Sequence, residues 1–227
     1  MACFLERKMD IQEQIRDIKK QFRLAMNGAV SQSMREKGLA YKLNFGVELP
    51  RLKSIASGYA KNHELAQALW KEDIREAKLL AGMLQPVDTF YPEIADIWVE
   101  GMHYPEIAEV TCMTLFQYLP YAPSKSFEWI ADGREYFQYC GFLLAARLLS
   151  KGMELNERAM AELLDQAQVA VLSEAFLPRK AAVLCLKKLG LQGKANAAKV
   201  LCLAGALRQE GRDDLLPLCE DIACELE

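Results

Sequence analysis

The sequence predicts an all-α fold in which helix pairs stack into a solenoid. No stretch sustains the alternation of apolar and polar residues that marks a β-strand, and valine, isoleucine and threonine do not cluster over a strand's length. Apolar residues instead recur at steps of three and four, and a unit of two helices recurs about every 30 to 40 residues. Because 52% of the 227 residues are apolar, the chain can bury a sizeable core.

The first helices follow from these steps. Ile11, Ile15, Ile18 and Phe22 form one apolar stripe, which predicts an amphipathic helix at the start of the chain. Further on, Asn62 is a suitable N-cap for a helix that ends near residues 71–73. The next helix is expected from Ile74 to just before Pro86, so that the two form a helical hairpin.

The same pair of helices then repeats along the chain. The second helices of successive pairs are expected to begin near Ile74, Ile107, Phe137 and Phe176, at spacings of 33, 30 and 39 residues. One pair cannot bury its apolar faces alone, so stacked pairs predict a HEAT-like helical repeat solenoid, an α-α superhelix. An up-and-down helix bundle uses the same helix pattern and stays open as the alternative.

We expect one HEAT-like repeat domain over residues 1–227, with an additional C-terminal helix pair over 191–227. The final helices are expected from Lys194 to Arg208 and from Arg212 onward, with Gly211 at the bend. No segment reaches the roughly 20 apolar residues that cross a bilayer, and residues 1–8 lack the apolar stretch of a signal peptide. These features favour a cytoplasmic location without membrane contact.

The cysteines point to packing and not to metal binding. Four of the seven lie inside apolar helical runs, namely Cys112, Cys140, Cys185 and Cys202. The closest pair, Cys219 and Cys224, lacks further ligands, because His63 and His103 are the only histidines. We therefore expect no metal and no cofactor.

The charge distribution leaves local nucleic-acid binding open. The net charge is −3 and the pI is near 5.6, which argues against a strongly basic binding protein. Residues 1–60 nevertheless carry 11 basic and 6 acidic side chains, whereas residues 61–130 carry 5 and 11. Residues 175–209 contain seven basic side chains and no acidic one. An anionic partner is therefore expected to meet only part of the surface.

The three tryptophans are assigned by their place in the helical pattern. Trp70 and Trp98 each end an apolar periodicity, which predicts that both lie in the core. Trp129 precedes the polar stretch 131–134, and we therefore expect it near a turn and at the surface.

Residues 44–53, which contain Gly46 and Pro50, together with Leu69-Trp70 and the run 74–76, resemble the N-terminal part of the AlkD-like DNA alkylation repair family. The resemblance covers about residues 10–190. It implies HEAT-like repeats whose concave basic face holds duplex DNA. It also implies a DNA glycosylase that excises positively charged alkylated purines from an aromatic cleft containing an aspartate and an arginine.

The resemblance also suggests where such a cleft falls in this chain. The family's run of tryptophans and aspartates aligns with residues 103–109, its arginine with Tyr139 and its later tryptophan with Leu184 or a neighbour. The catalytic candidates are therefore Glu109, Glu106 and Tyr139, with an acid replacing the aspartate. A plainer interpretation of Glu106 is an acid at the positive end of a helix dipole.

The residues expected to bind DNA are Arg51, Lys53, Tyr104, Trp129, Arg134, Arg179 and Lys180. The DNA hypothesis requires the basic ones to share one face. Arg179 and Lys180 begin a helix, where the dipole disfavours positive charge, so a phosphate ligand or a solvated face are the two explanations. If the basic residues scatter, the alternative is a noncatalytic scaffold that holds a protein or peptide in its groove.

Overall fold

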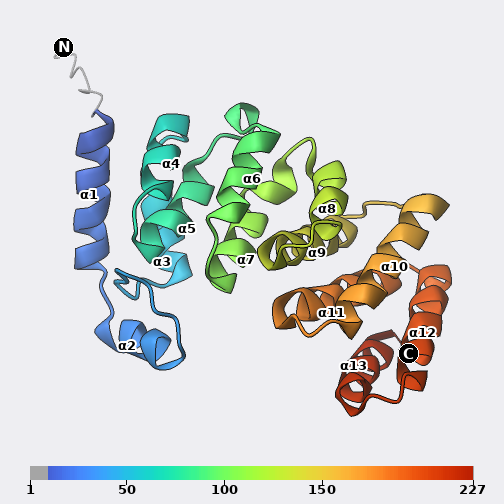
Figure 1. Cartoon of the computed structure of the whole chain (residues 1–227). Helices are drawn as coiled ribbons and strands as arrows, with labels where there is room; N and C mark the ends of the chain where they lie inside the picture. Colours follow the sequence, from blue (N-terminus) through green and yellow to red (C-terminus); the bar gives the residue numbers. More distant parts are fainter. Residues whose placement is uncertain (1–9, 227) are drawn as a thin grey trace. The chain divides into compact units, whose positions relative to one another are not determined.

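The computed structural model describes residues 10–226, and these residues form helices, turns and loops (Figure 1). Within that range no β-strand is present, and Leu43 and Ile74 form a single isolated bridge. The predicted all-α fold is confirmed. Residues 1–8, where the sequence lacks a signal-like stretch, lie outside the described part. Contacts divide the chain into two compact units, residues 1–90 and 91–227, which are described in turn.

Over its described residues, 10–90, the first unit contains five α-helices and one 3-10 turn, namely α1 (Ile11–Leu24), α2 (Gly28–Glu36), α3 (Leu49–Ala56), α4 (His63–Trp70), α5 (Arg75–Leu84) and η1 (Val87–Thr89). Asp10 and Glu13 cap the start of α1 reciprocally, each accepting a hydrogen bond from the other's backbone N–H. The expected apolar stripe of α1 is confirmed, because Ile15, Ile18 and Phe22 are buried.

The hairpin of α4 and α5 is also confirmed. Asn62 caps α4 by accepting a hydrogen bond from the backbone N–H of Leu65. Trp70 ends α4 and is buried, as expected. Helix α2 was not predicted, because its nine residues carry no clear apolar stripe and only Ser31 is buried.

A buried ion pair at the start of α5 holds the loop before α3. The Glu76 carboxylate accepts hydrogen bonds from the backbone N–H groups of Phe45 and Val47, both at 3.2 Å. Arg75 Nη1 donates to the carbonyl of Val47 at 3.0 Å and to Glu76 at 2.9 Å. Gly46 has a φ of +69°, and a Cβ there would lie 2.2 Å from the Asn27 carbonyl oxygen. The residues that carry the family resemblance here therefore have a structural role.

The second unit contains α6 (Pro92–Glu100), α7 (Pro105–Thr114), η2 (Phe116–Tyr118), α8 (Ala122–Ile130), α9 (Glu135–Ser150), α10 (Glu157–Leu172), α11 (Phe176–Gly190), α12 (Lys194–Gln209), η3 (Asp213–Leu215) and α13 (Leu216–Leu226). The second helices of the predicted pairs are α7, α9 and α11, and they begin within two residues of the predicted positions. Helix α9 packs against both α7 and α11. Its residues Phe142 and Leu144 lie in the core.

The predicted C-terminal helix pair is present as α12 and α13. Gly211 has a φ of +69° at the bend between them, a conformation that favours glycine. Helix α13 packs on α11 and α12, and its Cys219 and Ile222 are buried. The Leu226 side chain lies over Gly190 of α11 so closely that a Cβ on Gly190 would meet it at 2.5 Å.

The cysteine prediction holds for three of its four residues. Cys112, Cys140 and Cys185 are buried, and burial raises the pKa of the Cys185 thiol to about 12. Cys202 is exposed, so its predicted packing role is wrong: it lies on the outer side of α12, whose buried residues are Val200, Ala204 and Leu207. Among the described helices, none is both long and apolar enough to span a bilayer.

Candidate functional site

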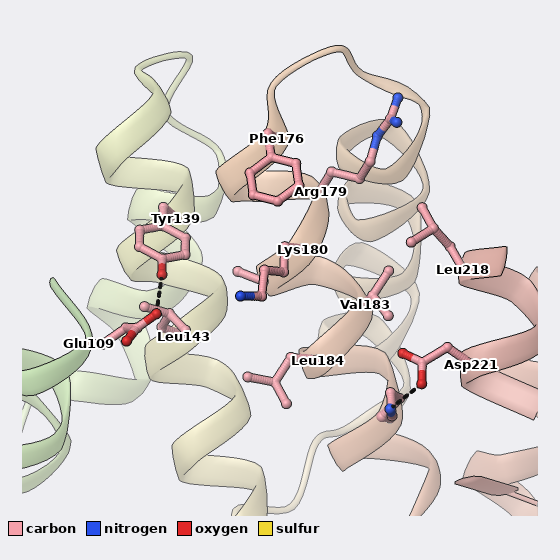
Figure 2. A pocket seen from close by; sticks show the side chains of 12 residues that line it. Glu109, Tyr139, Leu143, Phe176, Arg179, Lys180, Val183, Leu184, Leu218 and Asp221 are labelled. Atoms are coloured by element: carbon pink, nitrogen blue, oxygen red, sulfur yellow. Dashed lines mark hydrogen bonds and ion pairs between the residues drawn. The ribbon is translucent and has the colours of Figure 1, made fainter. Parts of the chain in front are cut away.

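A pocket of about 300 Å³ lies in the second unit, where α7, α9, α11 and α13 approach one another (Figure 2). Two of the three catalytic candidates, Glu109 and Tyr139, line it together with the DNA-binding candidates Arg179 and Lys180. Leu184, which the resemblance places at a family tryptophan, is also in its wall. Four sequence-predicted residues and the aligned leucine therefore meet at one site.

The polar end of the pocket is a hydrogen bond between neighbouring helices. The Tyr139 hydroxyl on α9 donates to Oε1 of Glu109 on α7, and the two oxygens are 2.8 Å apart. Tyr139 is only 2% exposed, whereas Glu109 is exposed. Burial and the bond to Glu109 raise the pKa of Tyr139 above its usual value, so the hydroxyl stays protonated as a donor near neutral pH. The second carboxylate oxygen of Glu109 remains available to a ligand.

The remaining wall is mostly apolar. Leu143 on α9 and Val183 on α11 supply buried surface, and Leu218 contributes from α13. Phe176 is 69% exposed and Leu184 is 37% exposed, so one aromatic and one aliphatic side chain are open to solvent at this site. Exposed apolar side chains beside a carboxylate and an amine are typical of a ligand site.

Lys180 and Arg179 are neighbours in sequence but have different surroundings. Figure 2 shows Lys180 and Leu184 on the opposite side of the cavity from the Glu109–Tyr139 pair. Lys180 is exposed, and within the described chain no carboxylate lies within 4 Å of its ammonium. Arg179 points away from that pair (Figure 2), bonding Asp214 at 2.9 Å and the Ser173 carbonyl through Nε at 2.9 Å. Lys180 is thus the cation that a ligand in this pocket would meet.

Acidic side chains of α13 pair with the lysines near the C-terminal end of α11. Lys187 pairs with Asp221 at 2.9 Å and with Glu225 at 2.5 Å, and Lys188 pairs with Glu225 at 3.3 Å. The sequence analysis found no acid within residues 175–209, yet these acids come from residues 221–225. Lys187 and Lys188 of the basic stretch 175–209 are therefore already paired with acids that lie outside that stretch.

The other predicted site residues lie outside this pocket. Tyr104 precedes α7 and Glu106 lies in its first turn, both half-buried, and neither lines the pocket. Arg134 is exposed but bonded to Asp132 at 2.8 Å and stacked over the Phe137 ring at 3.6 Å. Arg51 and Lys53 are exposed on α3 in the first unit. A face shared by the basic residues of both units stays a prediction.

The surface assignment of Trp129 is wrong. The side chain is 1% exposed and packs against Phe116, with ring centroids 5.2 Å apart. Its indole N–H donates to Asp96 Oδ1 at 2.7 Å. The polar stretch that follows forms the turn, while the tryptophan itself belongs to the last turn of α8 and faces inward. Trp98 is buried as predicted.

A second pocket, of about 420 Å³, adjoins the first through Leu184 and was missed. Arg147, Lys151 and Lys188 line it, and no acidic side chain does. Arg147 and Lys151 lie four residues apart at the end of α9, where the helix dipole is by itself a sufficient reason for basic residues in the sequence. Only the folded structure shows that Arg147 and Lys151 line a pocket together with Lys188 of α11.

Within residues 10–226, no group of three or more histidine, cysteine or acidic side chains is placed to hold a metal ion. The described site is therefore built of hydrogen-bonding, cationic and apolar side chains.

Comparison with known proteins identifies the family. The family model for the DNA alkylation repair enzyme matches residues 18–201, which include α7, α9 and α11. No curated protein matches the chain. A solved structure from "a new family of proteins related to the HEAT-like repeat DNA glycosylases with affinity for branched DNA structures" has a TM-score of 0.76 and 19% identity, covering 87% of this chain and 83% of that one. This likeness confirms the predicted HEAT-like repeat fold. Since the family model covers most of the sequence, the chain belongs to the DNA alkylation repair enzyme family.

Proposed function

We propose that this protein binds DNA through its sugar-phosphate backbone, using the side of the second unit where α9 and α11 border the Glu109–Tyr139 pocket. The observation that carries this proposal is Lys180, an exposed lysine without a carboxylate partner among the described residues at an otherwise largely apolar pocket. A free amine at a surface pocket suits a phosphate oxygen. Family membership supplies the class of ligand.

The preferred DNA is proposed to include branched structures. A protein of the same fold is described as having affinity for branched DNA. At 19% identity this likeness is a reason for testing junctions and not a demonstration for this chain. Backbone contacts are independent of sequence, so they suit a ligand that is recognised by its shape.

The test is a salt titration of binding to a continuous duplex and to a four-way junction, followed by fluorescence anisotropy. Affinity should fall steeply as salt rises, because bound lysines displace counterions from phosphates. Lys180→Gln should weaken binding roughly tenfold at low salt. Lys199→Gln, which removes an exposed lysine of α12 outside the pockets, is the matched control and should leave binding nearly unchanged.

Absence of salt-dependent binding to either DNA would remove the proposal. The alternative is then a noncatalytic solenoid whose groove holds a protein or peptide, as α-solenoids often do. The exposed Phe176 and Leu184 would be the anchors in that case.

Release of an alkylated base is a second candidate function, favoured by the Glu109–Tyr139 hydrogen bond. When the bond between a cationic purine and its sugar breaks, its electron pair neutralises the purine and positive charge develops on the sugar. A carboxylate held in place by Tyr139 is suited to stabilising that charge until water adds. The resemblance aligns the arginine of the family cleft with Tyr139 and its later tryptophan with Leu184 or a neighbour, so this site would act without either.

The assay for this second function is release of free base from duplex DNA treated with a methylating agent. Glu109→Gln should reduce release by about 100-fold or more, because it removes the negative charge. Tyr139→Phe keeps the carboxylate but loses its positioning bond and should cost less. If wild-type protein releases no base while still binding DNA, the backbone-binding function stands without the chemistry.

A further inference from the structure

The second pocket of the second unit has the composition of an anion site. It lies between η2, α9 and α11, and its lining residues are Gln117, Ala146, Arg147, Ser150, Lys151, Leu184 and Lys188. Three of these are cationic, one is an amide and none is acidic. A pocket with this lining attracts a ligand that carries negative charge and several acceptor oxygens.

Arg147 supplies an independent reason for a ligand. Its Nε is buried and has no hydrogen-bond partner among the described residues. A buried donor without an acceptor costs free energy, so such groups are uncommon in folded proteins. A phosphate oxygen is a strong acceptor, and the planar guanidinium can bond two oxygens of one phosphate. Because Arg147 lines the pocket, a phosphate bound there is a candidate acceptor for a donor that the described residues leave unsatisfied.

Lys151 and Lys188 complete the cationic lining. Lys151 Nζ lies 4.0 Å from the centroid of the Tyr118 ring, a cation–π contact that holds the amine but leaves its N–H groups free to donate. Within the described chain it forms no ion pair. Lys188 contacts Glu225 at 3.3 Å, and both side chains are about one third exposed. An ion pair this open to water is weak and can yield to a stronger anion.

The end of α9 does not need these cations as caps. The backbone N–H of Lys151 donates to the Arg147 and Leu148 carbonyls, and the side chain of Gln192 donates to the Leu149 carbonyl at 3.0 Å. Three full positive charges also exceed the roughly half negative charge at the end of a helix. The partial negative charge at the end of α9 therefore does not neutralise the three cationic side chains, and an anion can still bind them.

We propose that Arg147 and Lys151, assisted by Lys188, bind a backbone phosphate of DNA, as a second contact beside Lys180. Lys180, Leu184 and Lys188 are spaced by four residues and lie along one face of α11. The two pockets meet at Leu184, so one DNA strand can contact Lys180 and the Arg147 site through different phosphates. This inference rests on the proposed function and names the residues that grip the backbone.

The experiment compares the double variant Arg147→Gln, Lys151→Gln with Lys194→Gln, Lys199→Gln. Both remove two positive charges, but Lys194 and Lys199 are exposed on α12 and outside both pockets. Duplex affinity is measured over a salt series. The first variant should lower the steepness of the salt dependence by about 1 and weaken low-salt binding roughly tenfold, whereas the second should stay within about twofold of wild type. Thermal melting by circular dichroism establishes that each variant is folded.

A second variant and an NMR measurement distinguish loss of the phosphate contact from loss of the fold. If the double variant does not fold, Lys151→Gln alone is used, because Lys151 is exposed. In wild-type protein, the Arg147 Nε–H signal in an NMR spectrum should move downfield on adding a short duplex, as expected for a donor that gains an acceptor.

The outcomes separate the two proposals. Wild-type protein that binds DNA, with equal salt dependence in the two double variants and an unmoved Arg147 signal, would overturn the Arg147 site and leave the proposed function intact. Wild-type protein that shows no salt-dependent binding would overturn both. Loss of affinity and of salt dependence in the pocket variant alone would support the Arg147 site.

Discussion

Glu76 shows how one residue can hold a whole loop. Its carboxylate is fully buried, bonds two backbone N–H groups of the loop before α3, and pairs with buried Arg75. Glu76→Gln would remove the buried negative charge that pairs with Arg75 and would replace one of the two oxygens that bind the loop by an amide nitrogen. We expect a loss of about 3 to 5 kcal/mol in the free energy of unfolding, measured by urea denaturation.

The control for Glu76 is Glu72, which pairs with Lys19 at 2.8 Å while both side chains are about 30% exposed. Glu72→Gln should cost less than about 1 kcal/mol, since a partly exposed pair contributes little. Equal losses in the two variants would contradict the structural role of the buried pair.

Single residues were the hardest level to predict. Glu109 and Tyr139 were named from the resemblance alone, because nothing in their local sequence shows that they bond each other. Trp129 was misplaced, since a turn that begins two residues later says little about which way its ring faces. Arg147 has no distinguishing signal in the sequence, because basic residues at a helix end are ordinary. Pairing across helices requires the three-dimensional fold.

At the level of elements, an acidic side chain of α13 offsets the positive charge of two lysines on α11. Its Glu225 contacts both Lys187 and Lys188, so it competes with any phosphate for those amines. Glu225→Gln should therefore raise DNA affinity at low salt by about two- to fivefold.

Glu220→Gln is the matched variant for this prediction, because it removes an exposed acid from the same helix without breaking an ion pair in the described structure. It should change affinity much less in the same anisotropy titration. A similar increase in both variants would mean that only overall charge matters, and not the contact with α11.

The helices themselves were largely predictable because each has a local signal. Asn62 caps α4, Gly211 turns the chain before α13, and the apolar stripe of α1 faces the core. The exceptions are α2, which buries only Ser31, and the eight-residue α3, which buries Leu52 and Ile55. Short helices held by loop contacts have no such pattern to find.

For the whole molecule, the repeat spacing predicted the HEAT-like architecture, because each pair must bury its faces against the next. The division into two compact units at residue 90 has no signal in composition or linker sequence. One domain over residues 1–227 therefore stays a prediction. The sites also depend on long-range packing, since both pockets join helices that are distant in the sequence.

The acidic character of the last 26 residues has a practical consequence for handling the protein. Residues 202–227 contain two basic and seven acidic side chains, so the net charge of −3 for the full chain becomes +2 for residues 1–201. A fragment cut where the family model ends would change the sign of its net charge, so we expect it to bind a cation-exchange resin where the full chain binds an anion-exchange resin. Residues 202–227 thus decide on which ion-exchange resin the protein is retained, because the other residues are, taken together, basic.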